Sequence, residues 1–575
     1  MRLAVASLCV AITLPLRGQD TAVVVDTNVA VPMRDGVVLR ADVWRPRSEG
    51  KYPVLVYRTP YGKHVPGPAQ MTARKAVRRG YVVVLQDVRG RYASAGEFLP
   101  YQQEGNDGYD TIEWAAAQPW SNGAVGTFGL SYPGAVQWLA AVQNPPHLKA
   151  MVPAMTFASP MQFWYSNGIW DLSWLSWIWE NIAPDRWRRL GQPAGLPWDS
   201  VKTEMLSALP LSAVPHLDYI APWYYEWLRH PAYDPWWDWA DLTNKYASTS
   251  AAVLNFSAWY DDAYGPHGAT TNYAGLVATR GDSAARTALI LGPWPHGVPR
   301  SGRTSVGERA YGPDGGIDYD ETVLRWMDHY VRGLDNGVEH EKAVRFFVLG
   351  SNRWLTSDRW PVPGTQAETL YFQPAGALAR AQAERADTAV IVSDPLHPVR
   401  DAYAGTPGAH DYRDLVNTPG TVTFETQPLD ADLTVVGAID AHVSVRIDSR
   451  DTDLWIMVFD VAPDGTAFNL MSPGLEALRL SHRNGKRDLL RTGRPYDVQL
   501  SDLFTGNTFL RGHRIRVVLL PSFFPDFSRN LNTGDPESRS LRTRTAHITV
   551  YVGGGAPSFL VLPVLPRSAM LSADQ

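Results

Sequence analysis

Apolar runs and amphipathic segments alternate along the first part of the chain. Continuous Val- and Leu-rich runs lie at 53–57, 81–87 and 149–153, and helical patterns lie between them at 71–79 and 107–117. Uninterrupted apolar strands separated by helices are typical of a parallel sheet that is covered on both faces. The pattern from about residue 36 to 153 therefore predicts an α/β domain.

The same alternation resumes after residue 250. Apolar runs at 251–256 and 287–291 predict two more strands, and a helical pattern follows at 319–333. We therefore expect residues 21–155 and 249–355 to form one doubly wound α/β domain, with the intervening residues inserted into it.

The inserted segment, 156–248, is rich in aromatic residues. It holds 12 of the 22 tryptophans of the chain, from Trp164 to Trp239, and shows no sustained alternation with a period of two. This pattern predicts a helical cap over one edge of the sheet, in which Trp164 and Trp170 are candidates for lining a substrate pocket. The alternative is a helical subdomain whose core is simply rich in tryptophan.

The pattern changes again near residue 356. Short alternating runs dominate from there to about 566, among them 421–426, 441–446, 454–459 and 514–519. Pro463-Asp464-Gly465 and Asn484-Gly485 are expected to form hairpin turns between such strands. We predict an all-β sandwich, most simply a jelly roll.

The N-terminus differs from the rest of the chain. Arg2 precedes an uncharged apolar run from Leu3 to Leu16, which is short for a membrane span and resembles a secretory signal peptide over residues 1–20. The alternative is a disordered or strand-like N-terminus. Export predicts a periplasmic or secreted protein. Because Cys9 is the only cysteine, we expect neither disulfides nor a cysteine nucleophile in the mature chain.

The length and net charge of the chain limit the number of domains and the kinds of partner to expect. The chain has 575 residues, 45% of them hydrophobic and 19% charged, with a net charge of −5. This length predicts two to four domains. The charge gives no reason to expect nucleic acid or an anionic membrane as a partner, so a small molecule is the expected partner, with homo-oligomerisation left open.

The segment Gly129-Leu130-Ser131-Tyr132-Pro133-Gly134 carries the first chemical signal. An apolar strand pattern precedes it and a helix-forming pattern follows, as at the sharp turn that presents a nucleophilic serine to the N-terminus of a helix. The usual pentapeptide has glycine two residues after the serine, whereas here glycine stands three residues after it. Alone, the pattern also fits an ordinary strand-to-helix turn.

A nucleophilic serine needs a base and a carboxylate that orients the base. The strand predicted at 251–256 runs on to Asp261, and the strand at 287–291 runs on to His296. Both residues therefore follow strands whose carboxyl ends share an edge with Ser131, in the order Ser, Asp, His. Asp262 is the rival of Asp261, and His267, which follows no strand directly, is the weaker rival of His296.

The oxyanion of the tetrahedral intermediate needs two donors. The backbone N–H of Tyr132, directly after the serine, is the first candidate. The second is expected from the loop after an early strand, Arg58-Thr59-Pro60-Tyr61-Gly62-Lys63. From spacing alone, Tyr61 is equally well explained as a phenolic donor or as a packing residue.

Taken together, these motifs resemble the cocaine esterase/X-Pro dipeptidyl-peptidase family. The resemblance rests on the following segments in this order: Arg58 to Lys63, Gln86 to Tyr92 with Ser94 to Phe98, the serine turn, Trp259-Tyr260-Asp261, Gly292-Pro293-Trp294-Pro295-His296, Gly512 to Arg516, and Arg529 to Gly534. It implies an α/β-hydrolase domain with an inserted helical cap and a C-terminal jelly roll. It also implies a triad of Ser131, Asp261 and His296, with the Tyr61 phenol and the Tyr132 amide as oxyanion hole.

The resemblance implies a serine hydrolase that cleaves an ester or amide bond through an acyl-enzyme, without metal or cofactor. Members of the family act on aryl esters, α-amino acid esters and β-lactams, or X-Pro dipeptides, and the amino-ester hydrolases hold the substrate ammonium with carboxylates. Candidates here are Asp262, Asp171, Glu180 and Glu226, each of which, taken singly, is better explained as a surface or ion-pair residue. We favour an ester with a bulky or aromatic acyl group. A non-catalytic carbohydrate-binding protein is the remote alternative.

The remaining polar residues of the motifs are expected to be structural. Asp87, Arg89, Glu104 and Asp107 are predicted to support the sheet, with Arg89 pairing a carboxylate. His513 and Arg514 are predicted to lie in a strand as packing and interface residues.

Overall fold

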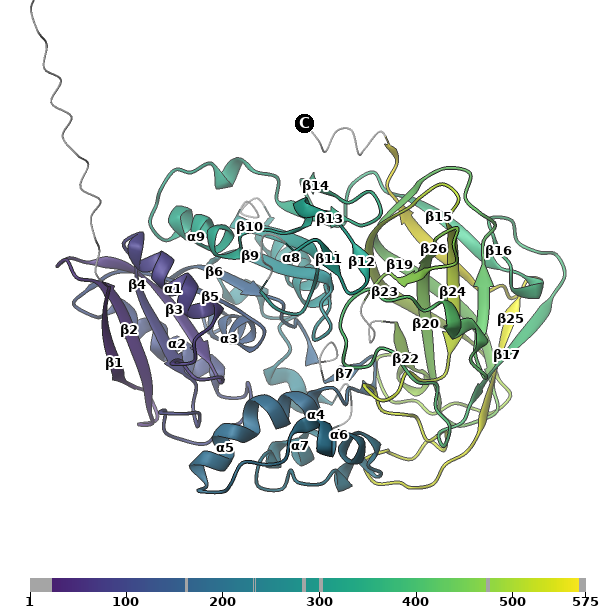
Figure 1. Cartoon of the computed structure of the whole chain (residues 1–575), viewed down its shortest axis with the longest axis horizontal. Helices are drawn as coiled ribbons and strands as arrows, with labels where there is room; N and C mark the ends of the chain where they lie inside the picture. The colour runs from purple at the N-terminus through teal and green to yellow at the C-terminus, as the bar shows by residue number, and fades with distance from the viewer. Residues whose placement is uncertain are drawn as a thin grey trace, which may run out of the picture.

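The computed structural model describes residues 23–160, 164–230, 232, 234–281, 286–298, 303–471 and 476–567. Figure 1 shows an α/β sheet domain, a helical segment along one of its edges, and a β-sandwich packed beside both. The predicted signal peptide at 1–20 lies outside the described residues.

Within the described residues, ten strands form one mixed sheet in the order β1-β2-β4-β3-β5-β6-β9-β10-β13-β14. The strands are β1 (Val23–Pro32), β2 (Val38–Pro46), β3 (Tyr52–Thr59), β4 (Val82–Asp87), β5 (Ser121–Leu130), β6 (Leu148–Ala154), β9 (Ala252–Tyr260), β10 (Thr287–Pro295), β13 (Val344–Val348) and β14 (Arg353–Ser357). The strands from β4 to β13 in this order pair in parallel, whereas β1, β2 and β14 are antiparallel additions at the two sides. The predicted doubly wound sheet is confirmed, although β1 was not expected.

Helices cover both faces of this sheet. α1 (Pro68–Arg78) and α9 (Tyr319–Tyr330) lie on one face, and α2 (Glu104–Ala116) and α3 (Tyr132–Ala141) lie on the other. All six residues of β4 are buried, because alternate side chains enter the two cores: Val83 packs in the core of α1 and Val84 in that of α2. This two-sided burial explains why the strand has no polar alternation. α8 (His267–Arg280) connects β9 to β10.

The inserted segment is predominantly helical, as predicted. It contains β7 (Tyr165–Ser166), β8 (Ile169–Trp170), α4 (Trp174–Trp177), a π-helical turn (Ile178–Ile182), α5 (Ala183–Arg189), α6 (Trp198–Ser207) and α7 (Pro222–Trp227), with short 3-10 turns at 211–213, 235–239 and 246–248. Its buried tryptophans join the same apolar core as α2 and α3. In Figure 1 these helices lie along the lower edge of the sheet domain and reach the sandwich.

The C-terminal part forms two antiparallel sheets, as predicted for a sandwich. One sheet has the order β16-β15-β26-β19-β25-β17 with β23 paired to β19, and the other has the order β18-β24-β20-β21 with β22 paired to β20. The strands are β15 (Gln366–Phe372), β16 (Leu378–Ala379), β17 (Asp387–Ser393), β18 (Val422–Glu425), β19 (Leu433–Ile447), β20 (Asp453–Val461), β21 (Ala467–Asn469), β22 (Ala477–Arg479), β23 (Pro495–Phe509), β24 (Arg514–Leu520), β25 (Ala546–Val552) and β26 (Phe559–Val564). The two-stranded ribbon of β11 (Ser305–Val306) and β12 (Arg309–Ala310) lies between the domains.

One of the two predicted hairpin turns is wrong. Pro463-Asp464-Gly465 joins β20 to β21, which pair with each other. Asn484-Gly485 follows β22 and leads to β23, and these two strands belong to different sheets. The dipeptide thus makes a turn at which the chain crosses the sandwich, because turn chemistry specifies a local bend and not the partner of the next strand.

Polar contacts fasten the sandwich to the sheet domain. The Tyr260 phenol donates to the Asn469 carbonyl at 2.7 Å, and Asp460 accepts from Arg309 at 2.9 Å and pairs with His513 Nδ1 at 2.7 Å. His513 lies just before β24, outside the strand predicted for it, and shares Asp460 with Arg309, while Arg514 is the first residue of β24 and pairs with Glu425 at 3.6 Å. The sandwich is therefore anchored at the end of β9, close to the residues discussed next.

Candidate active site

Ser131 occupies a strained turn between β5 and α3. Its backbone has φ 69° and ψ −129°, a conformation that costs energy for a residue with a side chain. The neighbouring glycines are required by close contacts: a Cβ on Gly129 would lie 2.6 Å from Pro133 Cβ, and one on Gly134 would lie 2.5 Å from the Ala154 carbonyl oxygen. The glycine three residues after the serine therefore fulfils the steric role expected of it.

The turn aims Ser131 at the N-terminus of α3. The Ser131 N–H donates to the Ala154 carbonyl at 3.0 Å, which ties the turn to β6. The N–H of Tyr132 lies in the first turn of α3, where the helix supplies no acceptor. This amide and the positive end of the helix dipole are therefore available to an anion beside the serine.

Asp261 and His296 meet as a hydrogen-bonded pair at the carboxyl ends of β9 and β10. Asp261 Oδ1 lies 2.7 Å from His296 Nδ1, and the Asp261 side chain is fully buried while 22% of the His296 side chain is exposed. The N–H groups of Ala263 and Tyr264 also reach Asp261 Oδ1, at 3.2 and 3.4 Å. The carboxylate is thus held in place, and it fixes the orientation of the imidazole.

Asp262 and His267, the alternatives to Asp261 and His296, make contacts different from those of that pair. Asp262 Oδ1 accepts the backbone N–H of His296 at 3.0 Å, so Asp262 binds the same histidine through its main chain. His267 begins α8 and lies 3.5 Å from Asp502 of β23, with its ring against Phe504. His267 is therefore part of the contact between domains.

The carboxylates set the protonation of His296. Burial disfavours the imidazolium, but the charges of Asp261 and Asp262 outweigh this effect and raise the pKa of His296 above its ordinary value. Asp262 is exposed, yet desolvation in its crowded surroundings, together with the Asp261 charge, raises the pKa of its carboxyl group. The two carboxylates thus stabilise a proton on the histidine.

The Tyr61 phenol lies beside Ser131, in the loop after β3. Trp177 Nε1 donates to the phenolic oxygen at 3.0 Å. Burial raises the pKa of Tyr61, opposed by its hydrogen bonds with Trp177 and Ser131, so the phenol remains protonated at neutral pH. The indole N–H can only donate, which leaves the phenolic proton free to point elsewhere. Spacing alone leaves two roles open for Tyr61, and this position favours the phenolic donor over the packing residue.

Aromatic rings surround this group, and several were not singled out from the sequence. Tyr101 stacks on Tyr132 with centroids 4.1 Å apart, and Trp177 lies parallel to Tyr132 at 6.3 Å. The ring centroids of Trp174 and Tyr264 lie 5.7 Å apart. Trp174 and Trp177 are spaced i, i+3 on α4, a signal of a shared helix face. The contacts with Tyr101 and Tyr264 join distant parts of the chain and leave no local trace.

The two tryptophans proposed for the pocket lie deeper. Trp164 is fully buried, with its ring 3.8 Å from that of Trp227 and 6.1 Å from that of Tyr101, so it backs the inner aromatic layer. Trp170 packs against Tyr165 and Tyr224. The structure places both residues in the aromatic core of the inserted segment.

The other predicted roles can be compared with observed contacts. Arg89 makes a two-pronged ion pair with Asp107 at 2.9 and 2.6 Å, which confirms its predicted pairing. Glu104 accepts from the Tyr132 phenol at 2.8 Å and pairs with Arg58, and Asp87 pairs with Lys63 at 2.9 Å. These buried groups support the loop that carries Tyr61 and the start of α3 at Tyr132.

The candidate carboxylates of the inserted segment separate into two kinds. Glu226 pairs with Arg229 and His230, and Glu180 is exposed. Asp171 is buried, and desolvation raises its pKa to about 8, with further contributions from Asp526 and Asp262. The pKa of Asp526 is raised to about 6, first by burial and then by Asp401 and Asp262. Asp171 and Asp526 therefore lie close enough to Asp262 for mutual repulsion.

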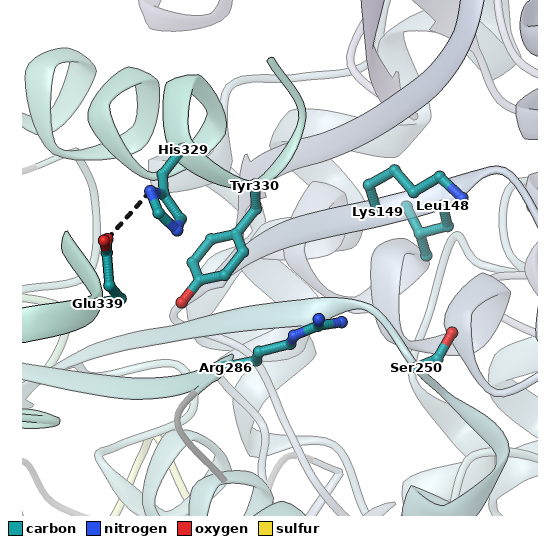
Figure 2. A pocket seen from close by; sticks show the side chains of 7 residues that line it. All are labelled: Leu148, Lys149, Ser250, Arg286, His329, Tyr330 and Glu339. Atoms are coloured by element: carbon teal, nitrogen blue, oxygen red, sulfur yellow. Dashed lines mark ion pairs between the residues drawn. The ribbon is translucent and has the colours of Figure 1, made fainter. Parts of the chain in front are cut away.

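A recess of about 460 Å³ lies at the opposite edge of the sheet (Figure 2). Its lining residues come from the start of β6, from the residues just before β9 and β10, and from the end of α9 and the turn that follows it: Leu148, Lys149, Ser250, Arg286, His329, Tyr330 and Glu339. Asp261 and His296 lie at the carboxyl ends of β9 and β10, and Ser131 follows the carboxyl end of the neighbouring β5, so this recess is separate from the group of Ser131, Asp261 and His296.

Two further searches cover only the residues with described positions. In that part of the chain, no helix is long and apolar enough to cross a bilayer, and no group of three or more His, Cys, Asp or Glu side chains is arranged to hold a metal ion.

Comparison with known proteins identifies the family. Residues 35–298 match the X-Pro dipeptidyl-peptidase (S15 family) model, and residues 336–561 match the X-Pro dipeptidyl-peptidase C-terminal non-catalytic domain. The chain is 32% identical to the cocaine esterase of Rhodococcus sp. (strain MB1 Bresler), over 94% of this chain and 99% of that protein. The chain belongs to the cocaine esterase/X-Pro dipeptidyl-peptidase (CocE/NonD) family. It is a serine hydrolase.

Solved structures share the whole architecture. An aminopeptidase from a marine sediment Thaumarchaeota archaeon has a TM-score of 0.81 at 22% identity, covering 98% of this chain and 99% of that one. An α-amino acid ester hydrolase has a TM-score of 0.80 at 24% identity, covering 97% of this chain and all of that one. These likenesses establish the α/β-hydrolase fold with its C-terminal β domain.

Proposed function

We propose that this family member hydrolyses carboxylic esters with a bulky or aromatic acyl group, through an acyl-enzyme on Ser131. The observation that carries the proposal is the 2.7 Å pair of Asp261 and His296 at the sheet edge where the strained Ser131 turn also ends. The relative named cocaine esterase supports an ester as the substrate.

The proposed steps follow the geometry. His296 takes the Ser131 proton as Oγ attacks the carbonyl carbon, and Asp261 stabilises the resulting imidazolium. The Tyr61 phenol and the Tyr132 amide donate to the oxyanion. His296 then gives its proton to the leaving alkoxide, and a water molecule, activated by the same imidazole, releases the acid from Ser131.

The aromatic surroundings support the choice of acyl group. Trp174, Trp177 and Tyr264 present rigid apolar rings near the serine, and such surfaces favour flat or bulky apolar groups. Export to the periplasm or the outside remains part of the proposal, since it rests on residues 1–20 alone.

A second candidate is an α-amino ester or a peptide with a free N-terminus. The observation that favours it is the cluster of Asp262, Asp171 and Asp526, whose pKa values are all raised, in each case first by desolvation. A substrate ammonium would relieve the repulsion among them and displace a proton. Asp526 comes from the sandwich, so the C-terminal domain would then take part in recognition.

Three substrates with the same aromatic acyl group distinguish the candidates: a phenyl ester, its α-amino analogue, and a dipeptide anilide with proline second. We expect the highest kcat/KM for the plain ester. Preference for the free-amine substrates would replace the proposal with its alternative, and Asp526→Asn should then raise KM for them alone. The matched control is Glu226→Gln, which alters the exposed ion pair of the inserted segment. It should leave kcat/KM unchanged for all three substrates.

A further inference from the structure

Arg91 is a buried cation whose carboxylate neighbour is distant. It is only 1% exposed, and its ion pair with Asp185 spans 3.7 Å from Nη1 to Oδ2. Asp185 has closer partners, since it accepts the Tyr92 N–H at 2.9 Å and pairs with Arg188 at 2.6 Å. A charge that is taken out of water destabilises the fold unless hydrogen bonds replace its hydration. The hydrogen bonds of the Arg91 guanidinium therefore have to offset that cost.

The Arg91 guanidinium donates to three main-chain carbonyls on two different segments. Nε donates to Pro60 at 2.8 Å, while Nη1 and Nη2 donate to Ile182 and Asn181 at 2.8 and 3.0 Å. Pro60 directly precedes Tyr61 in the loop after β3, and the other two residues end the π-helical turn of the inserted segment. The rigid fork of an arginine side chain can join two segments in this way, whereas a lysine ammonium is a single point on a flexible stem.

The same two segments meet again at the Tyr61 phenol. Trp177 directly precedes the π-helical turn, and its Nε1 donates to the phenolic oxygen at 3.0 Å. At the main chain, the Tyr61 N–H donates to Thr59 Oγ1 at 3.1 Å. Both polar atoms of the peptide group between Pro60 and Tyr61 are thus bound, the carbonyl oxygen by Arg91 and the N–H by Thr59.

These contacts form a closed ring, which runs from Arg91 through the Tyr61 loop to Trp177 and back along the π-helical turn. Arg91 fixes the spacing of the two segments, and the hydrogen bond from Trp177 holds the phenol at that spacing. An oxyanion donor has to lie within hydrogen-bond reach of the oxygen on which charge develops, so a small displacement of the donor lowers the rate. Loss of Arg91 should therefore act on catalysis through the position of the phenol.

We propose that Arg91 is a positioning residue of the oxyanion hole, which holds the Tyr61 phenol in place by joining its loop to the helical turn behind Trp177. This inference rests on the proposed function, in which the phenol donates to the oxyanion. Arg91 acts through Tyr61 and Trp177 and takes no part in the bond changes. Its removal should therefore lower kcat and leave KM nearly unchanged.

The test is a double-mutant cycle of Arg91→Lys and Tyr61→Phe, measured as kcat on a phenyl ester. Arg91→Lys keeps the positive charge and loses the fork, and we expect kcat to fall about tenfold, with KM within about twofold of wild type. In the Tyr61→Phe background the phenol is already absent, so Arg91→Lys should lower kcat by less than about twofold. Losses that multiply in the double variant would assign Arg91 a structural role only and overturn the inference.

Arg280→Lys is the matched control. Arg280 also donates to main-chain carbonyls, those of Thr249 and Ala251 at 3.3 and 2.6 Å, but at the amino edge of the sheet. This variant should keep the kcat of its parent in both backgrounds. If Arg91→Lys does not fold, Arg91→Met takes its place in the cycle, because a neutral side chain at the buried site needs no partner for a charge. Multiplied losses with that variant overturn the inference equally.

The remaining outcomes separate this inference from the proposed function. A folded Arg91→Lys with wild-type kcat, in a chain that hydrolyses esters and loses activity in Tyr61→Phe, would overturn the inference and leave the proposed function intact. If Tyr61→Phe keeps the wild-type kcat, the phenol is not an oxyanion donor and the inference is wrong with it. If the wild-type chain neither hydrolyses esters nor is labelled at Ser131 by a fluorophosphonate, the proposed function fails and the inference falls with it.

Discussion

The two edges of the central sheet lie at opposite ends of the same strands and differ in kind. At the carboxyl edge, Ser131, Asp261 and His296 are buried or half-buried, and a short hydrogen bond of 2.7 Å joins Asp261 to His296. At the amino edge lies the recess of about 460 Å³ shown in Figure 2, where Lys149 and Arg286 are exposed.

A surface pocket does not by itself identify the catalytic site. The lining of the recess holds one ion pair, between His329 and Glu339 at 3.1 Å, and partly exposed pairs of this kind contribute little. At the carboxyl edge, desolvation and neighbouring carboxylates raise the pKa values of Asp262 and Asp171. Groups that are fixed in position and desolvated before substrate arrives are those that stabilise a transition state.

Asp261→Asn should show the largest effect. The amide keeps the shape of the side chain but removes the charge that holds the His296 imidazole in its orientation. We expect kcat to fall roughly 10⁴-fold, as when the carboxylate of such a triad is replaced, with the melting temperature nearly unchanged. Steady-state kinetics on a phenyl ester measures this. A loss of less than about tenfold would mean that the pair does not act in catalysis.

Tyr61→Phe should come next. It removes one donor to the oxyanion, and we expect kcat to fall by about 10²- to 10³-fold with little change in KM. Trp177→Phe keeps the phenol and removes only its indole partner, so its effect should be smaller. Equal effects of both variants on KM, with kcat unchanged, would assign Tyr61 to substrate packing.

Asp262→Asn should move the pH profile. A histidine that acts as base must be neutral, so kcat/KM falls as the pH drops through the pKa of His296. Asp262 raises this pKa, and removing its charge lowers it, which shifts the acidic limb to lower pH. A profile of kcat/KM against pH measures the shift, with Glu226→Gln as the control. An acidic limb that stays at the wild-type pH, or that shifts to higher pH, would contradict this assignment.

Arg286→Gln should show the smallest effect. This residue is exposed in the recess at the amino edge, and surface substitutions usually change stability by less than about 0.5 kcal/mol. We expect kcat/KM within about twofold of wild type in the same ester assay. A tenfold loss of kcat/KM would mean that the amino edge of the sheet also contributes to catalysis.

The sequence predicts the sheet well because burial on both faces leaves a strong pattern. The run at 81–87 becomes β4, whose six residues are all buried, and the polar residues after β9 and β10 lie at the expected edge. By contrast, β1 is half exposed and irregular, with a register shift between Asp26 and Val29, and it left no clear apolar pattern.

The details of the site are harder to predict because they are tertiary. The pair of Trp177 and Tyr61 joins residues 116 positions apart, and that of Tyr101 and Tyr264 joins residues 163 apart. The choice of Trp164 and Trp170 followed tryptophan density, whereas the tryptophans that contact Tyr61 and Tyr264 are Trp177 and Trp174. The sequence identifies the nucleophile and its partners by strand position, but not the side chains that complete their surroundings.

The most direct test is to locate the acyl group during turnover. The wild-type chain and Ser131→Ala are mixed with an aromatic ester, quenched in acid, and mapped by peptide mass spectrometry. The account predicts an adduct with the mass of the acyl group on the peptide that contains Ser131, and neither adduct nor turnover above background in a folded Ser131→Ala. Turnover by that variant at the wild-type rate, or an adduct on another residue, would contradict it.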